Sequence, residues 1–289
     1  MIDNKGQLVV ALPQHQPKSF LYYILIYVII PIAAPILITY KMITDKSYLS
    51  TTASLYSLVA NATKNPCSTQ WYFQNVTLLR KLWELPSAKA YIDKETNEPL
   101  VEYQIQEGYC GSATQRCILK SLGCSSVIIP QQKRGESKPD IWCEHICQIG
   151  QQLKMEVTTK IVRGDVTYEE FLSTLKRGLE SKNCRIGCNF LRSALTGFEG
   201  NNSFWWLSPS FILTKVYAGH FSPVLGIVEQ DGKEGEGKNP FVAIWDTNHK
   251  YNGAYFVPAR RLYDAVSAVD VLSNLHRAII LVEKKETCN

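Results

Sequence analysis

The stretch from Phe20 to Tyr40, FLYYILIYVIIPIAAPILITY, is the feature that most limits how this chain can fold. Its 21 residues carry no charge and lie between Lys18 and Lys41. As a helix they would measure about 31 Å, close to the thickness of the hydrocarbon core of a bilayer. A helix on the surface of a water-soluble domain needs one polar face, and this stretch has none. The sequence therefore predicts a transmembrane anchor over residues 20–40.

Two other interpretations of this stretch are weaker. A cleaved signal peptide has an apolar core of about 7–15 residues followed by small residues at a cleavage site. The sequence KMITDKSY after Tyr40 offers no such site. A buried core helix is the second alternative.

Pro31 and Pro35 would kink the anchor, which membranes tolerate. We expect a single-pass membrane protein whose orientation stays open, because lysines flank the stretch on both sides.

The rest of the chain divides into three parts around this anchor. Residues 1–19 form an N-terminal tail, residues 41–66 are rich in Ser and Thr and suit a spacer, and residues 67–289 make one globular body. Hydrophobic residues make up 45% of the chain and charged residues 20%, which excludes a disordered protein and a coiled coil. The formal charge of +5 includes no basic run, so no nucleic-acid partner is expected.

Periodicity within the body predicts helices first and strands later. Apolar residues recur at helical spacing over 168–180, after Thr167 as a cap, and a second helix is expected over 258–269. Strands are expected over 185–190, 223–229, 241–246 and 278–282, the middle two as an antiparallel hairpin. This order indicates an α+β arrangement rather than alternating βαβ units.

Cys110 is the first candidate for chemistry. Tyr109-Cys110-Gly111 precedes SATQRCILKSL, and Gly123 closes this segment, so we expect a helix that begins at Cys110. The dipole at a helix N-terminus favours a thiolate, which is the nucleophilic form of cysteine. A single cysteine in an apolar helix is more often a small buried hydrophobe. Cys110 therefore needs partners before it counts as a nucleophile.

His220 and Asp246 supply such partners. His220 lies in the run GHFSP at the start of one expected strand, and Asp246 ends the next. If the two strands pair, the imidazole and the carboxylate become neighbours, which gives Cys110 a base and the base an orienting group. Each residue alone is more often structural, but the three together favour one thiol active site.

The same motifs resemble the phytochelatin synthase family. The likeness rests on Gln104 six residues before Cys110-Gly111, on GHFSP at 219–223, and on the run from Ile244 to Asp246, followed by Val257-Pro258 and a helix. GHFSP is the most specific of these. The run NFLR at 189–192 also resembles the strand that this family places before its histidine. The likeness extends from about residue 85 to about residue 270.

The resemblance implies a papain-like cysteine-proteinase fold, here behind the transmembrane helix, and an enzyme that acts on glutathione. Carried over by position, Cys110 is the nucleophile, His220 the general base and acid, Asp246 the orienting carboxylate, and Gln104 an oxyanion-hole donor. The residues expected to contact substrate are Gly111, Gly219, Ser222 and His249, the last in place of an arginine common in the family. The implied reaction releases glycine and passes γ-Glu-Cys to a second glutathione or to water. The chain resembles the short, catalytic form of the family.

Two cysteines are also candidates for metal binding. Cys143 and Cys147 are four residues apart, so on a helix they would share a face, and thiolates select ions such as Zn²⁺ and Cd²⁺. Core thiols are the more common alternative, and Cys67 could instead pair with Cys288 in an oxidising compartment. The resemblance implies no obligatory cofactor, with Cd²⁺ or Zn²⁺ as an activator or as the metal–glutathione thiolate substrate. The expected partners are glutathione, its metal thiolates, and a membrane through residues 20–40.

Other functions stay open. A papain-like peptidase of the bacteriocin-leader type also has a Gln six residues before Cys-Gly, but it lacks GHFSP and is fused to a transporter ATPase. A non-catalytic, membrane-tethered, metal-binding thiol protein would make the catalytic set accidental. Residues 193–218 form a longer insertion than the family has, interpreted either as a lid or membrane-facing patch or as core packing.

Overall fold

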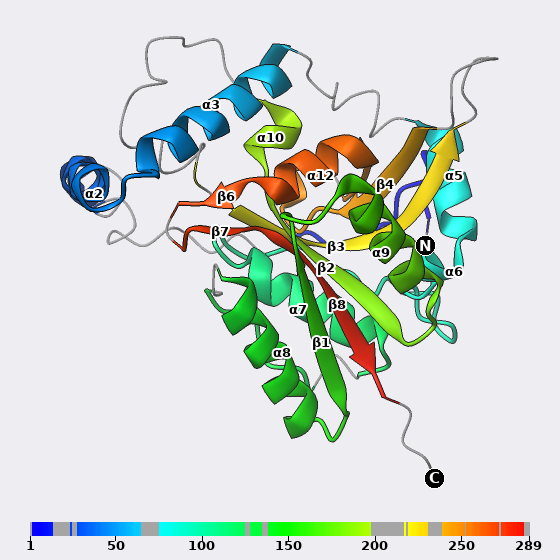
Figure 1. Cartoon of the computed structure of the whole chain (residues 1–289). Helices are drawn as coiled ribbons and strands as arrows, with labels where there is room; N and C mark the ends of the chain where they lie inside the picture. The colour runs from blue at the N-terminus through cyan, green and yellow to red at the C-terminus, as the bar shows by residue number, and fades with distance from the viewer. Residues whose placement is uncertain are drawn as a thin grey trace.

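A six-stranded antiparallel sheet organises the chain (Figure 1). The computed structural model describes residues 2–13, 24, 28–64, 75–124, 128–134, 138–197, 217, 219–230, 239–251, 253–271 and 273–285. The strand order is β1-β8-β2-β3-β4-β5, and each neighbouring pair is antiparallel. The strands are β1 (Val157–Arg163), β2 (Cys184–Leu191), β3 (Gly219–Gln230), β4 (Asn239–Trp245), β5 (Ala254–Pro258) and β8 (Ala278–Lys284). A separate pair joins β6 (Val269–Asp270) to β7 (Leu275–His276).

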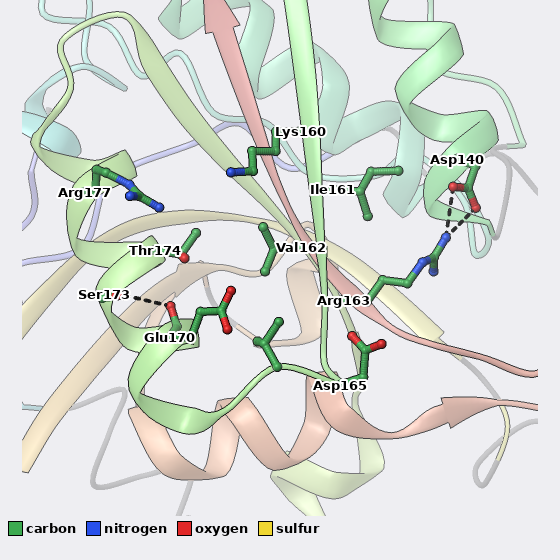
Figure 2. Close-up of a pocket in the computed structure, with 11 residues that line it drawn as sticks. Asp140, Lys160, Ile161, Val162, Arg163, Asp165, Glu170, Ser173, Thr174 and Arg177 are labelled. Carbon is green, nitrogen blue, oxygen red and sulfur yellow. Dashed lines mark hydrogen bonds and ion pairs between the residues drawn. The ribbon is translucent and has the colours of Figure 1, made fainter.

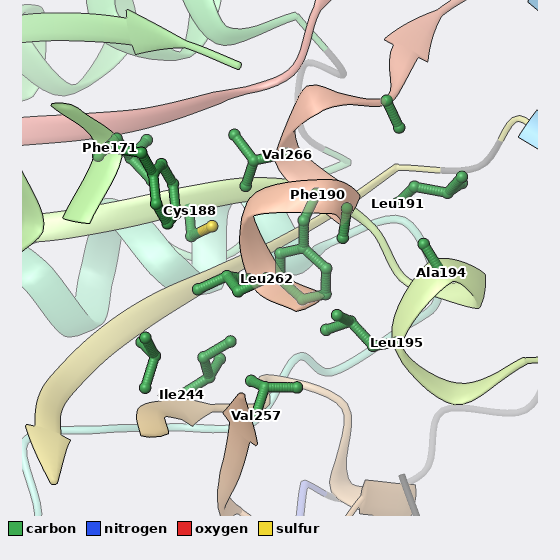
Figure 3. Close-up of a cluster of buried hydrophobic side chains, with 14 of the residues drawn as sticks. Phe171, Cys188, Phe190, Leu191, Ala194, Leu195, Ile244, Val257, Leu262 and Val266 are labelled. Carbon is green, nitrogen blue, oxygen red and sulfur yellow. The ribbon is translucent and has the colours of Figure 1, made fainter. Parts of the chain in front are cut away.

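Helices cover both faces of the sheet. One face carries α5 (Val76–Glu84), α6 (Pro86–Lys89), α7 (Cys110–Ser121) and α8 (Pro139–Gln152). The other face carries α3 (Tyr48–Lys64), α9 (Tyr168–Glu180), α10 (Ser193–Thr196) and α12 (Ala259–Ser267). Because side chains alternate along a strand, Ile244 of β4 joins the core under α12, whereas its neighbour Ala243 joins the core under α5. Figure 3 shows the first of these cores, with Phe190 and Leu262 at its centre.

Most of the elements expected in the body are confirmed. The helix expected over 168–180 is α9, and the Thr167 hydroxyl accepts the Glu170 N–H as its N-cap. The helix expected to begin at Cys110 is α7, and Gly123 follows it in a left-handed conformation, with φ of 95°. The expected hairpin is β3 and β4, which pair directly. The α+β arrangement of the body is the one the sequence indicates.

The rest of the expected fold, a papain-like core behind a transmembrane helix, is wrong. The body is one open six-stranded antiparallel sheet between helices, and no helix among the described residues is long and apolar enough to cross a membrane. Within the apolar run, the described helix is α2 (Ile30–Thr44), whose 15 residues measure about 22 Å. It continues past Lys41, and Val28 and Ile29 directly before it have π-helical conformation.

The segment expected to be a spacer forms helix α3. Its Leu55 and Val59 are buried in the same core as α12, and Arg261 of α12 donates to the Ala62 carbonyl at 3.0 Å. The N-terminal residues also pack on the body, because Leu8 is buried beside α5 and the Trp83 indole donates to the Gly6 carbonyl at 2.7 Å. Only a few residues of α3 are apolar and buried, and the helix is otherwise rich in Ser and Thr. Its composition therefore resembles that of a spacer.

Truncation of Leu55 tests the packing of α3. Leu55 is 3% exposed and Leu49 on the same helix is 59% exposed. We expect Leu55→Ala to lower the free energy of unfolding by about 2–5 kcal/mol, because a cavity replaces the buried side chain. Leu49→Ala is the matched control and should change it by less than about 0.5 kcal/mol. Equal effects in thermal or denaturant unfolding would mean that α3 does not pack on the body.

Candidate active site

The N-terminus of α7 positions Cys110. Cys110 is the first residue of this helix, which packs against β2 and β3, and the Tyr109 side chain does not cap it. No side chain caps the N–H groups of the first turn, so their partial positive charge is available to stabilise a thiolate at Cys110. The thiol also contacts the His220 side chain and the Phe221 backbone N–H. Strand β3 thus brings the expected base to the expected nucleophile.

Strand pairing places His220 beside Asp246. His220 is the second residue of β3, Asp246 directly follows β4, and β3 pairs with β4. The His220 Nε2 atom lies 3.0 Å from an Asp246 carboxylate oxygen, and both residues are buried. Since Nε2 faces Asp246, Nδ1 is the ring nitrogen left for Cys110. Cys110, His220 and Asp246 therefore have the order of contacts that a thiol, a base and an orienting carboxylate require.

Arg192, which the sequence did not single out as a site residue, completes this cluster. It follows β2, and its guanidinium forms an ion pair with both carboxylate oxygens of Asp246. The same Nη2 atom lies 2.7 Å from His220 Nε2, and the guanidinium stands over the Tyr251 ring at 4.0 Å. The signal in the sequence was the arginine of the NFLR run, which the resemblance placed just before the histidine.

The surroundings of Cys110 favour its thiolate. Burial, the largest single effect, raises the pKa of this thiol, and the His220 imidazole opposes it through its charge and a hydrogen bond. The Phe221 N–H and the Arg192 charge act in the same direction, so the pKa of Cys110 lies below its ordinary value. Burial instead raises the pKa of five other thiols, to about 12 in the case of Cys117. The other four are Cys124, Cys143, Cys184 and Cys188.

The pKa shifts of His220 and Asp246 favour the charged forms of both residues. Burial and the Arg192 charge lower the pKa of His220, but Asp246 and the Cys110 thiolate outweigh them, so this pKa lies above its ordinary value. Burial raises the pKa of Asp246, whereas the charges of Arg192 and His220 and the Asn248 N–H hold it well below its usual range. Asp246 therefore stays ionised, and a thiolate–imidazolium pair is favoured between Cys110 and His220.

Gln104 lies beside the aspartate loop. Its backbone N–H donates to the Thr247 carbonyl at 2.6 Å, and its side-chain oxygen accepts the Thr247 hydroxyl at 3.4 Å. Thr247 is fully buried and also lies 3.4 Å from the Phe221 carbonyl. Because the amide oxygen is held by Thr247, the NH₂ group of Gln104 faces the opposite way. The role of Gln104 as an oxyanion-hole donor stays a prediction.

The four residues expected to contact substrate lie in different surroundings. The Gly111 carbonyl accepts the Trp142 indole N–H at 3.0 Å, so Gly111 anchors α7 to α8. Ser222 is fully buried on β3, and its hydroxyl has no hydrogen-bond partner among the described residues. His249 is half-buried in the loop after Asp246, with its ring edge-on to Tyr103. Of the four, the half-buried His249 and the exposed Gly219 have the exposure that a substrate contact requires.

Gly219 is needed by packing. A Cβ atom here would lie 2.1 Å from Nη1 of Arg277, a fully buried guanidinium that donates to the Tyr217 carbonyl. Only glycine leaves room for this arginine. Gly219 therefore lets Arg277 pack directly against the start of β3, beside His220.

Cys143 and Cys147 lie on α8 as expected, on one face of the helix. Cys143 is buried, and desolvation raises its pKa to about 12. The Cys147 thiol lies 3.7 Å from the Thr159 hydroxyl of β1. No group of three or more His, Cys, Asp or Glu side chains that could hold a metal ion is found in the described part of the chain. Metal binding by this pair stays a prediction.

Cys67, Cys288 and most of the predicted insertion, at 198–216, lie outside the described residues.

Comparison with known protein families finds no match, and a search of curated proteins finds no relative. The resemblance to phytochelatin synthases therefore rests on the motif residues themselves.

Alkylation tests the thiolate of Cys110. At about pH 6, where ordinary thiols are protonated, we expect iodoacetamide to label Cys110 first, because its pKa lies below the ordinary value. Labelling should slow as the pH falls through the pKa of Cys110 and the thiolate is lost. Peptide mass spectrometry identifies the labelled residue, with Cys110→Ala as the control. Faster labelling of Cys124 or Cys147, both half-buried, would contradict the assignment.

Substitution of Arg192 tests its role as a positioning residue. Arg192 lowers the pKa of Cys110 by its charge, so Arg192→Met should move the pH profile of alkylation toward higher pH and slow labelling several-fold at acidic pH. Arg192→Lys keeps the charge and should restore most of the profile. A structural role alone would lower the unfolding temperature in Arg192→Met and leave the alkylation profile unchanged.

Proposed function

We propose that this protein is a thiol acyltransferase that cleaves the Cys–Gly bond of glutathione and passes the γ-glutamylcysteinyl group to a second glutathione or to water. The observation that carries the proposal is the convergence of Cys110, His220 and Asp246, which are far apart in the sequence, at one end of the sheet. This geometry supports nucleophilic acyl transfer. The choice of glutathione is supported by the resemblance of GHFSP and its companion motifs to phytochelatin synthases.

In the first step, the Cys110 thiolate attacks the carbonyl carbon of the Cys–Gly bond, and the carbonyl oxygen becomes an oxyanion. The Cys110 backbone N–H and the Gln104 amide are the donors expected to stabilise it, each worth about 3–4 kcal/mol in the transition state of comparable enzymes. His220 then gives a proton to the glycine nitrogen, glycine leaves, and a γ-glutamylcysteinyl thioester remains on Cys110.

In the second step, the acceptor attacks this thioester. His220, now neutral, takes a proton from the α-amino group of a second glutathione or from water, and Cys110 leaves as a thiolate. Transfer to glutathione makes a γ-Glu-Cys oligomer, and transfer to water makes γ-glutamylcysteine. In this proposal Cd²⁺ or Zn²⁺ enters as the metal–glutathione thiolate, which is a substrate, and heavy-metal detoxification or glutathione turnover is the expected role.

Product analysis tests the proposal. The full chain, Cys110→Ala and His220→Ala are incubated with glutathione, with and without Cd²⁺, and products are identified by mass spectrometry. We expect the wild type to release glycine and both variants to lose about a thousandfold or more of this activity. Cys124→Ala, at a half-buried thiol that contacts Met155, is the matched control and should retain activity.

The products separate the open alternatives. Oligomers of γ-Glu-Cys that require Cys110 identify a transpeptidase, and γ-glutamylcysteine without oligomers identifies a glutathione hydrolase. Turnover that survives in Cys110→Ala would refute the assigned nucleophile. Absence of glutathione turnover, with Cys110 still reactive toward iodoacetamide, would favour a cysteine peptidase of another specificity.

A further inference from the structure

Strand β1 leaves one edge of the sheet open. It is the outermost strand in the order β1-β8-β2-β3-β4-β5, and β8 is its strand partner in the part of the chain that the structure describes. An open edge presents backbone N–H and C=O groups that can pair with another extended chain. The question is which residues of β1 present these groups.

The register of β1 on β8 shows which residues of β1 present their backbone groups to the open edge. The Gly164 N–H donates to the Arg277 carbonyl at 2.9 Å, and the Lys285 N–H donates to the Glu156 carbonyl at 2.9 Å. Both pairs continue the register that sets Arg163 opposite Ala278. In an antiparallel ladder, every second residue bonds to its partner and the residues between point the other way. Thr159 and Ile161 therefore direct their N–H and C=O groups to the open edge.

A groove of about 580 Å³ lies along this edge, between β1 and α9 (Figure 2). Its residues come from both elements. Lys160 and Val162 line it from the α9 side of β1, and Glu170, Ser173 and Arg177 line it from α9 itself. A strand added beside Thr159 and Ile161 would direct every second side chain into this groove.

The groove has a basic end. Figure 2 shows the Lys160 and Arg177 side chains directed toward each other across it. Both are exposed. The acidic side chains of Asp165 and Glu170 also line the groove, and ion pairs nearby join Arg163 to Asp140 at 2.7 Å and Lys176 to Glu229 at 3.6 Å. Among the described residues, Lys160 and Arg177 form no ion pair with an acidic side chain. An incoming chain with a carboxylate at this point would supply one.

Lys160 also argues against a second copy of the chain as the occupant. Two β1 strands paired about their centres would place Lys160 opposite Lys160, and like charges directly opposite destabilise an antiparallel pair. A lysine in the middle of an edge strand prevents self-association. The same lysine attracts an acidic strand.

We propose that the open edge of β1 and the adjoining groove bind an extended acidic peptide by strand addition. Thr159 and Ile161 supply the backbone hydrogen bonds, and Lys160 and Arg177 contact an acidic side chain of the peptide. This site is separate from Cys110 and does not depend on the proposed reaction.

A fluorescent pentapeptide tests the proposal on the full chain. Acetyl-Val-Glu-Val-Glu-Val-amide is titrated against the wild type, and the same peptide with Lys in place of Glu should bind about tenfold or more weakly. Arg177→Glu should weaken binding of the Glu peptide about tenfold. Lys176→Glu makes the same change of charge at the next residue of α9, outside the groove, and should leave binding unchanged.

N-methylated peptides test the pairing itself. Methyl groups on alternate peptide nitrogens block one edge of the peptide at a time, so one methylated set should abolish binding and the other should keep it. Equal loss with both sets, or equal affinity of the Lys and Glu peptides, would overturn strand addition. A dimer in sedimentation velocity that Arg177→Glu dissociates would assign the edge to a second copy and overturn the peptide proposal.

Discussion

The buried carboxylate of Asp246 is the constraint on which the candidate site depends. Asp246 is fully buried and ionised, and a charge in such a place is strongly unfavourable unless opposite charges and hydrogen bonds surround it. Arg192 and His220 supply the charges, and the Asn248 N–H donates at 2.8 Å. These partners are adjacent only because β2, β3 and β4 are neighbours in the sheet. The strand order therefore determines the geometry of the candidate site, because any other order would leave the charge of Asp246 uncompensated.

Trp142 connects the helix that begins at Cys110 to the strand that carries His220. It is buried on α8, its indole donates to the carbonyl of Gly111, directly after Cys110, and its ring stacks on Phe221, directly after His220, with centroids 5.7 Å apart. One rigid side chain thus holds the neighbours of both reacting groups. Gly219 and Arg277 hold the start of β3 from the other side. The distance between Cys110 and His220 is consequently set by packing of the core on both sides of the sheet.

Local signals predicted part of this structure, and long-range pairing decided the rest. Caps and apolar stripes are local, so α7 and α9 were predicted with their first residues correct. Strand β1 was missed because VTTKIVR buries only its first and sixth residues and has a lysine at its centre. The N-terminal prediction failed because composition does not say where a helix ends, and α2 continues past Lys41 to Thr44. The NFLR run marked Arg192 only through the resemblance, and its contacts with Asp246 and His220 depend on β2 lying beside β3.

The charges of the cluster balance in both proton arrangements of Cys110 and His220. Arg192 and Asp246 carry opposite charges, so the site is neutral overall when Cys110 and His220 are both neutral, and it stays neutral when the proton moves from thiol to imidazole. Without Arg192, the cluster would carry a net negative charge in a buried site in either proton arrangement. In the proposed reaction, attack moves the negative charge of the Cys110 thiolate to the oxyanion, and glycine leaves with the proton of His220. The acylated cluster then holds the charges of Arg192 and Asp246 alone and is again neutral. Arg192 lowers the pKa of His220 by its charge, and in the acylated site the Cys110 thiolate no longer opposes this effect. In this proposal His220 therefore stays neutral after glycine leaves, as the base of the second step must be.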